Sequence, residues 1–96
     1  MTRVLLHGAW RGFAGGAREV QLPATTLREA LEGLAAAHPA LKERLRDEHG
    51  TLRPHLALFV NDEDARLLGW EDAKLRDTDV VHIIPALSGG SNEEDV

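Results

Sequence analysis

The sequence contains no cysteine, which excludes disulfide bonds, thiolate metal sites and a catalytic thiol. It also lacks any apolar run near the roughly 20 residues that a membrane-spanning helix requires. The apolar segment that follows Met1 is only Val4–Leu6, far too short for the core of a signal peptide. These absences predict a cytoplasmic protein that does not enter a membrane.

A strong charge of one sign is missing as well. The formal net charge is −5, and Glu93, Glu94 and Asp95 supply three of the negative charges. No basic stripe with interleaved aromatic residues occurs, which argues against nucleic-acid binding. The five histidines show no pair at metal-ligand spacing, so no metal site is predicted. No nucleophile–base pair is visible either, so no catalytic residue is predicted.

The 96 residues fit one domain, and alternating or continuous apolar segments predict five strands. Pro23 and Pro85 end two of these strands, since proline has no N–H to donate to a ladder. The glycine-rich segment 8–16, which also contains Trp10, predicts a loop between the first two strands. The expected strands are 4–8, 17–22, 56–60, 65–68 and 80–84.

One long amphipathic helix is expected between the second and third strands. Thr26 and Glu29 match a capping box at its start, and His38 followed by Pro39 marks its end. Its apolar face consists of Leu27, Ala30, Leu31, Leu34 and Ala35. A single such helix favours an α+β fold in which it covers one face of a mixed sheet. With the first and last strands parallel in the sheet centre, this is the β-grasp (ubiquitin-like) architecture.

The last strand is followed by Pro85, three small or apolar residues, and Gly89-Gly90. This ending resembles that of the MoaD/ThiS sulfur carriers. Residues 60–64 (VNDED), 75–80 (LRDTDV) and 15–20 (GGAREV) are similar to further motifs of that family. Thr78 departs from the family's usual glycine, which leaves the type of that turn open. The resemblance implies a β-grasp domain over 1–88 and a flexible tail over 89–96.

The resemblance also implies a function for the tail. In this family an E1-like adenylating enzyme of the ThiF/MoeB type attaches AMP to the terminal carboxylate, using ATP. A sulfur donor then gives a thiocarboxylate, or an amine captures the acyl group as an isopeptide. By this analogy Gly90 carries the reacting carbonyl and Gly89 is a slender spacer. The protein would be a carrier without a bound cofactor, not an enzyme, and would deliver sulfur to a synthase or target protein.

Six residues follow Gly90, whereas most carriers of this family end at the diglycine. Gly90 has no free carboxylate while it is bonded to Ser91. We therefore predict cleavage between Gly90 and Ser91, with a JAMM-type metallopeptidase as the expected enzyme. The alternative is a β-grasp interaction module whose tail is never cleaved. The sequence does not choose among molybdopterin, thiamine, cysteine or other sulfur pathways, or conjugation to proteins.

Strand alternation predicts a docking patch near the tail. If the helix covers Leu58, Val81 and their neighbours, the opposite face presents Phe59, His82 and Ile84, with Leu87 beyond the strand. Ubiquitin-like proteins dock their activating enzyme on this face, and exposed apolar clusters often mark partner sites. The alternative is a register shifted by one residue, which would place the same side chains in the core.

Overall fold

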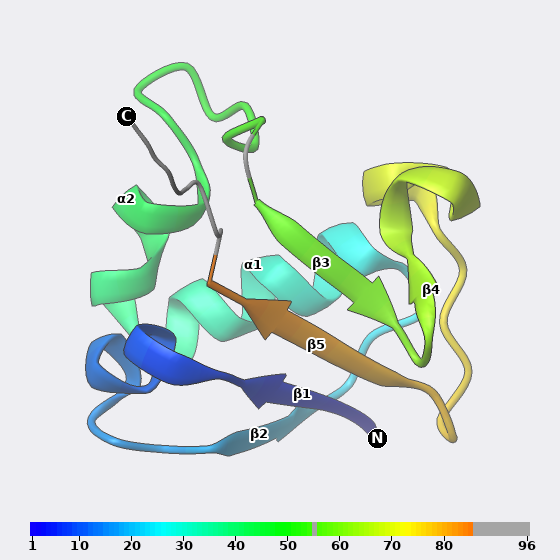
Figure 1. Ribbon diagram of the computed structural model, residues 1–96, viewed down its shortest axis with the longest axis horizontal. Coiled ribbons are helices and arrows are strands. Elements are labelled where there is room, and N and C mark those ends of the chain that lie inside the picture. Colours follow the sequence, from blue (N-terminus) through cyan, green and yellow to red (C-terminus); the bar gives the residue numbers. More distant parts are fainter. Residues whose placement is uncertain (55, 86–96) are drawn as a thin grey trace, which may run out of the picture.

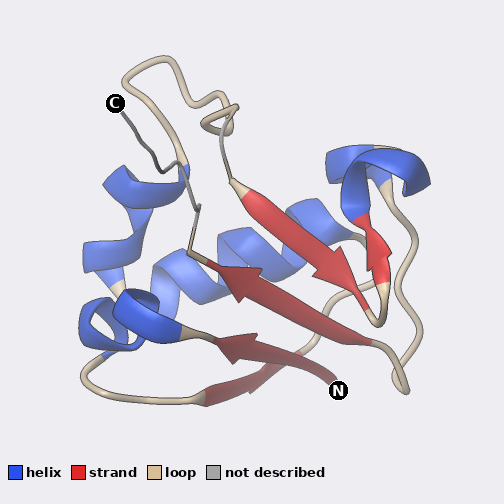
Figure 2. Cartoon of the chain, viewed as in Figure 1, coloured by secondary structure: helices blue, strands red, loops and turns tan. Residues whose placement is uncertain are grey.

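The computed structural model describes residues 1–54 and 56–85. Figures 1 and 2 show a sheet with helical segments on one face and at both ends. The strands are β1 (Thr2–Leu6), β2 (Glu19–Leu22), β3 (Ala57–Val60), β4 (Glu63–Asp64) and β5 (Val80–Ile84). The helices are α1 (Leu27–Ala37), α2 (Lys42–Leu45) and four 3₁₀ segments: η1 (Gly8–Ala14), η2 (Pro39–Leu41), η3 (Ala65–Leu68) and η4 (Trp70–Asp72).

The sheet order is β2-β1-β5-β3-β4, with the first and last strands side by side in its centre. β1 and β5 run parallel, while the other neighbouring pairs are antiparallel. α1 lies across one face of this sheet (Figure 1). The predicted mixed sheet with parallel central strands is therefore confirmed.

α1 begins where the sequence predicted, through a cap that differs in one detail. Thr26 Oγ1 accepts a hydrogen bond from the Glu29 N–H at 3.2 Å, as in a capping box. The Glu29 carboxylate, however, accepts from the N–H and hydroxyl of Thr25 at 2.8 and 2.9 Å, not from Thr26. The helix ends at Ala37, one residue before His38, because Pro39 disfavours helical geometry in the residue that precedes it.

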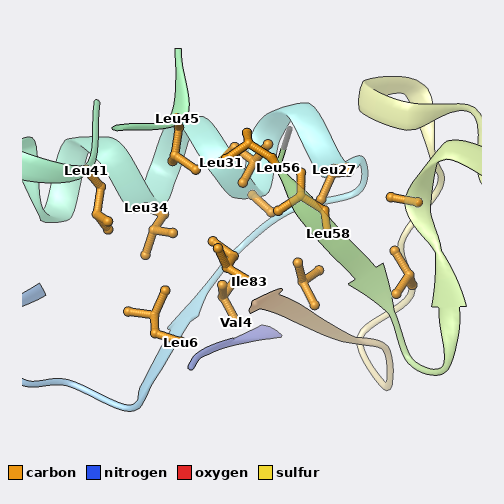
Figure 3. Close-up of a cluster of buried hydrophobic side chains, with 14 of the residues drawn as sticks. Val4, Leu6, Leu27, Leu31, Leu34, Leu41, Leu45, Leu56, Leu58 and Ile83 are labelled. Atoms are coloured by element: carbon orange, nitrogen blue, oxygen red, sulfur yellow. The ribbon is translucent and has the colours of Figure 1, made fainter. Parts of the chain in front are cut away.

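The core lies between α1 and the inner face of the sheet (Figure 3). Leucines of α1 point toward valine, leucine and isoleucine side chains of β1, β3 and β5, and α2 with η2 closes one end. Removing these apolar surfaces from water is the main source of stability for the fold. The largest fully buried side chains include Val4, Leu6, Leu27, Leu31, Leu34, Leu41, Leu45, Leu58, Val81 and Ile83.

Two local predictions were wrong. The segment 65–68, expected as a strand, is the 3₁₀ helix η3, and the short strand β4 precedes it. The Asp64 carboxylate caps η3 by accepting from the Arg66 N–H at 2.9 Å, and Ala, Arg and Leu all favour helical geometry. The glycine-rich segment expected as a loop is largely the 3₁₀ helix η1, which ends at Gly15 in the left-handed conformation.

Candidate functional site

The chain leaves the sheet at Ile84 and Pro85, the last described residues before the predicted diglycine. Gly8 fixes this exit. Its φ of +58° is a left-handed conformation, and a Cβ there would lie 2.6 Å from Cγ of Pro85. The His7 N–H donates to the Ile83 carbonyl at 3.0 Å, which holds the start of η1 against the end of β5. Close packing on a glycine thus determines where the tail begins.

The residues that the sequence assigned to activation and cleavage, Gly89, Gly90 and Ser91, lie outside the described residues, as does Leu87 of the predicted patch. These assignments, and the division into 1–88 and 89–96, stay predictions. We call Ile84 and Pro85 the root of the tail. The structure describes the surfaces on either side of this root, and any enzyme that acts on the tail must approach them.

One of these surfaces is the outer face of the sheet. Phe59 of β3 is paired with His82 of β5, and Ala57 with Ile84, so the three predicted patch residues lie together. Phe59, His82 and Ile84 are half-buried and border a shallow hollow of about 270 Å³. Leu58 points into the core, so the one-residue shift in register does not occur. That partners dock on this patch stays a prediction.

A histidine pair that was not predicted lies on the same face. His7 Nε2 and His82 Nδ1 are 3.0 Å apart, and the ring centroids are separated by 5.2 Å. The two residues are 75 positions apart, and the parallel pairing of β1 with β5 brings them together. Burial, and then the nearby His7, lower the pKa of His82 below its ordinary value, while Asp62 acts in the opposite direction. The pair therefore favours a neutral His82 within the patch.

Two residues in the family-like motifs have a structural function at the base of β5. Asp79 accepts from Asn61 Nδ2 at 3.0 Å and from the Arg76 N–H at 2.8 Å. Asn61 in turn accepts from the Val80 N–H at 3.1 Å. The backbone and amide donors hold the pKa of Asp79 below its usual value. Thr78 has a negative φ, so this turn does not require the family's glycine.

The other surface beside the tail's root is a groove of about 480 Å³, which we call the root groove. Trp10 and Phe13 of η1 line it together with Arg44 and Arg53. No local pattern marks these arginines, because Arg44 lies among alternating charges and Arg53 lies in a loop. Their convergence depends on how α2 and the loop after it pack against η1. The remaining lining residues are Glu43, Leu56, Ile84 and Pro85.

Metal-ligating clusters and membrane-spanning helices can be assessed only in the part of the chain that the structure describes. Within residues 1–54 and 56–85, no three metal-ligating side chains gather in a way that could hold a metal ion. None of the helices described there has the length and apolar character needed to cross a bilayer.

Trp10 and Trp70 both pack as half-buried lids against the core.

Comparison with known proteins decides the family. Residues 4–90 match the profile of the ThiS family, so the match covers the β-grasp body and ends on the second glycine of the diglycine. The chain belongs to the ThiS family. The six residues after Gly90 lie beyond the match.

Relatives of this ThiS-family chain include sulfur carriers and modifiers. It is 35% identical to the sulfur carrier protein CysO of Mycobacterium tuberculosis over 82 residues, which cover 83% of the chain and 88% of the relative. It is 34% identical to small archaeal modifier protein 1 of Haloferax volcanii, covering 84% and 98% of the two chains. The chain is therefore of the sulfur carrier or ubiquitin-like modifier class, whose members are substrates of E1-like enzymes and not enzymes.

Solved structures agree on the architecture of the ThiS-family chain. The CysO chain in the BexX/CysO complex of Amycolatopsis orientalis superimposes with a TM-score of 0.83 at 31% identity, covering 94% of this chain and all of that one. Mycobacterium tuberculosis CysO gives a TM-score of 0.80 at 32% identity, covering 90% and 99%. The fold is thus the predicted β-grasp, ubiquitin-like fold.

Proposed function

We propose that this protein is a sulfur carrier, or a small protein modifier, that reacts through the carboxylate of Gly90 after residues 91–96 have been removed. The observation that carries the proposal is the family match, which ends on Gly90 although the chain continues. A carrier of this type acts in the presence of ATP, so we place its activity in the cytoplasm.

The first step is hydrolysis of the bond between Gly90 and Ser91. Water adds across this amide, leaving a carboxylate on Gly90 and a free amine on Ser91. A JAMM-type metallopeptidase fits this step, because such enzymes cut after glycine in extended β-grasp carriers. Without the cut, Gly90 offers no carboxylate to an activating enzyme.

The second step is activation by an E1-like enzyme. The Gly90 carboxylate attacks the α-phosphate of ATP, forming an acyl-adenylate and releasing pyrophosphate. Hydrosulfide then attacks the carbonyl carbon and displaces AMP, which leaves a thiocarboxylate on the chain. The diglycine suits both reactions, because it has no side chains to obstruct a narrow active-site channel. A sulfur-accepting synthase would receive the sulfur of the thiocarboxylate. In a modifier, the amine of a target lysine would instead attack the acyl-adenylate, displacing AMP and forming an isopeptide.

Docking of the activating enzyme would use the patch of Phe59, His82 and Ile84. Ile84 is the last residue of β5, so an enzyme that covers the patch also lies over the root of the tail. Half-buried apolar side chains at such a site suit the centre of an interface. The Amycolatopsis relative crystallised in its BexX/CysO complex, which shows that a carrier of this class forms protein complexes.

Intact-mass spectrometry tests the activation step. A chain ending at Gly90 is incubated with ATP, sulfide and the E1-like enzyme of the same organism. We expect a mass gain equal to one sulfur replacing one oxygen, and no gain for the full chain, whose Gly90 carboxyl is blocked. A Gly90→Val version of the shortened chain is the matched control and is expected to react far more slowly.

The result also separates the proposal from its alternative. If the shortened chain gains no mass while the enzyme activates another carrier, the protein is an uncleaved β-grasp interaction module. The processing step is tested by mass spectrometry of the protein isolated from its native cells. Detection of the full-length chain alone would contradict the proposed removal of residues 91–96.

A further inference from the structure

The root groove combines an aromatic wall with two arginines. Trp10 and Phe13 pack edge to face, with ring centroids 6.0 Å apart. The guanidinium carbon of Arg44 lies 4.5 Å from the centroid of the Phe13 ring, a cation–π contact. Arg53 Nε donates to the Glu43 carbonyl at 2.9 Å, which fixes its side chain at the rim. The groove therefore presents a preformed apolar and cationic surface.

These two arginines differ from several others in the described part of the chain. Arg3, Arg28 and Arg46 each have a carboxylate oxygen at 2.6–2.8 Å. Among the ion pairs of residues 1–54 and 56–85, none includes Arg44 or Arg53. Glu43 also lines the groove, so the lining carries two positive charges and one negative charge. Arg53 also acts on the nearby Asp47 carboxylate, whose pKa is lowered first by backbone hydrogen bonds and in smaller part by Arg53. Arg44 is therefore the less compensated of the two, and the groove lining keeps a net positive charge that suits an anionic occupant.

The sequence supplies an anionic segment that starts from the groove itself. Pro85 lines the groove, and the chain continues from it to Glu93, Glu94 and Asp95. Seven residues separate Pro85 from Glu93. At about 3.4 Å per residue they span at most roughly 25–30 Å, comparable with the protein's shorter dimensions of 29 and 26 Å. The linker is long enough to turn back, and its two glycines permit a reversal.

We propose that the root groove binds the acidic segment Glu93–Asp95 of the same chain. Its carboxylates pair with Arg44 and Arg53, and the chain between Pro85 and the acidic segment is held against the body. Tethering gives a local concentration in the millimolar range, so a contact with millimolar intrinsic affinity is already about half formed. Charge complementarity and the length of the tether both select this segment as the occupant.

The docking has a consequence that rests on the proposed function. In the uncleaved chain, docking would tie the segment around Gly90 and Ser91 to the body at both ends. The segment could then enter the narrow active-site channel of the activating enzyme less easily. Removal of residues 91–96 takes away the anionic anchor, so the diglycine is released from the body when its carboxylate appears. Cleavage would thus both create the Gly90 carboxylate and free the diglycine to reach the activating enzyme.

Tryptophan indole N–H signals in two-dimensional NMR spectra test the docking itself, without any enzyme. Trp10 lies in the groove, whereas Trp70 belongs to η4, at the opposite side of the molecule in Figure 1, and serves as an internal reference. Between the full chain and the chain ending at Gly90, we expect the Trp10 signal to shift and that of Trp70 to stay in place. Raising the salt concentration of the full chain should move Trp10 toward its position in the shortened chain.

Charge reversal identifies the partners. Arg44→Glu with Arg53→Glu in the full chain is expected to give the Trp10 position of the shortened chain carrying the same two changes. Adding Glu93→Lys and Glu94→Lys to these changes should restore a tail-dependent shift. Arg18→Glu is the matched control, because Arg18 is exposed and lies outside the groove, and it should leave the tail-dependent shift intact.

A second readout is the rate at which a glutamate-specific endoprotease cuts after Glu93 or Glu94. We expect about a twofold increase when both groove arginines are reversed, in line with half occupancy, and none for Arg18→Glu. Identical Trp10 signals in the full and shortened chains would overturn the proposal. A shift that grows with protein concentration would also overturn it, because the occupant would then be a second copy. Neither outcome bears on the mass gain at Gly90, which tests the carrier function separately.

Discussion

The two faces of the sheet are built by alternating residues of the same strands, yet they differ sharply in burial. Leu58 and Ile83 are completely buried against α1, whereas their neighbours Phe59, His82 and Ile84 are half-buried on the outer face. Apart from His82 all of them are apolar, so residue type alone does not separate the two faces. The inner face therefore carries most of the folding energy, while the outer face is accessible to partners, as the predicted docking patch requires.

The largest loss of stability is expected from a substitution on the inner face. Leu58→Ala removes a fully buried side chain and leaves a cavity between β3 and α1, which should lower the free energy of unfolding by about 2–5 kcal/mol. Phe59→Ala, one residue further along, is the matched change on the outer face and should cost less than half as much. Urea denaturation of both variants measures the difference. Equal losses would mean that the outer face is also part of the core.

A smaller loss is expected at the boundary between the faces, where the tail begins. Gly8→Ala forces a left-handed conformation on alanine and places its Cβ against Pro85, so we expect a loss of about 2 kcal/mol. Gly12→Ala is the control, because no atom lies within 4 Å of its Cβ position and its φ is not left-handed. It should change the free energy of unfolding by less than about 0.5 kcal/mol. A neutral Gly8→Ala would show that the exit of the tail is not fixed by this contact.

Alternation and helical periodicity predicted a mixed sheet with one covering helix, and the resemblance to the MoaD/ThiS carriers supported the β-grasp arrangement. Leu27, Leu31 and Leu34 recur at helical spacing and therefore share one face of α1. Alternation separates Leu58 from Phe59, but only the structure showed that Leu58 lies on the buried face. η3 was missed because the turn residues Asn61 and Asp62 suggested a returning strand after them, while the Asp64 cap that favours a 3₁₀ turn is a weak local signal.

The parts of the site that depend on long-range contacts could not be predicted. His7 and His82 meet only through the parallel pairing of β1 and β5, and their separation in sequence gives no sign of it. Arg44 and Arg53 line the same groove because Arg44 lies over the Phe13 ring of η1 and Arg53 is held by the Glu43 carbonyl. Sequence patterns encode faces and periodicity, whereas such clusters require the topology to be known first.

A binding measurement can show which part of the outer face contacts the E1-like enzyme. Phe59→Ala should weaken the affinity for the E1-like enzyme at least tenfold, about 1.4 kcal/mol, because aromatic side chains at the centre of an interface contribute most. Gln21→Ala lies on the outer face of β2, away from the patch, and should leave the affinity unchanged. Isothermal titration calorimetry with the shortened chain gives both values. A tenfold loss for Gln21→Ala and none for Phe59→Ala would move the docking site to the β2 edge.

The smallest effect is expected from protonation of the outer face. The folded state lowers the pKa of His82, chiefly through burial and then through His7, while Asp62 opposes this and Arg3 adds to it. The unfolded chain therefore binds a proton more readily. The contribution of His82 to stability is complete above the ordinary histidine pKa of about 6.5, and it is lost as the pH falls through the lowered pKa of the folded state.

Urea denaturation at pH 7.5 and 5.5 isolates this contribution, because the carboxylates whose pKa values are lowered, such as Asp79, stay ionised in both states over that range. The free energy of unfolding of the parent chain should fall between the two pH values, and His82→Gln should reduce the fall. His49→Gln, at an exposed histidine, should leave it unchanged. If His82→Gln keeps the full pH dependence, the histidine pair has no energetic link to folding. The outer face would then differ from the inner face in burial but not in its response to pH.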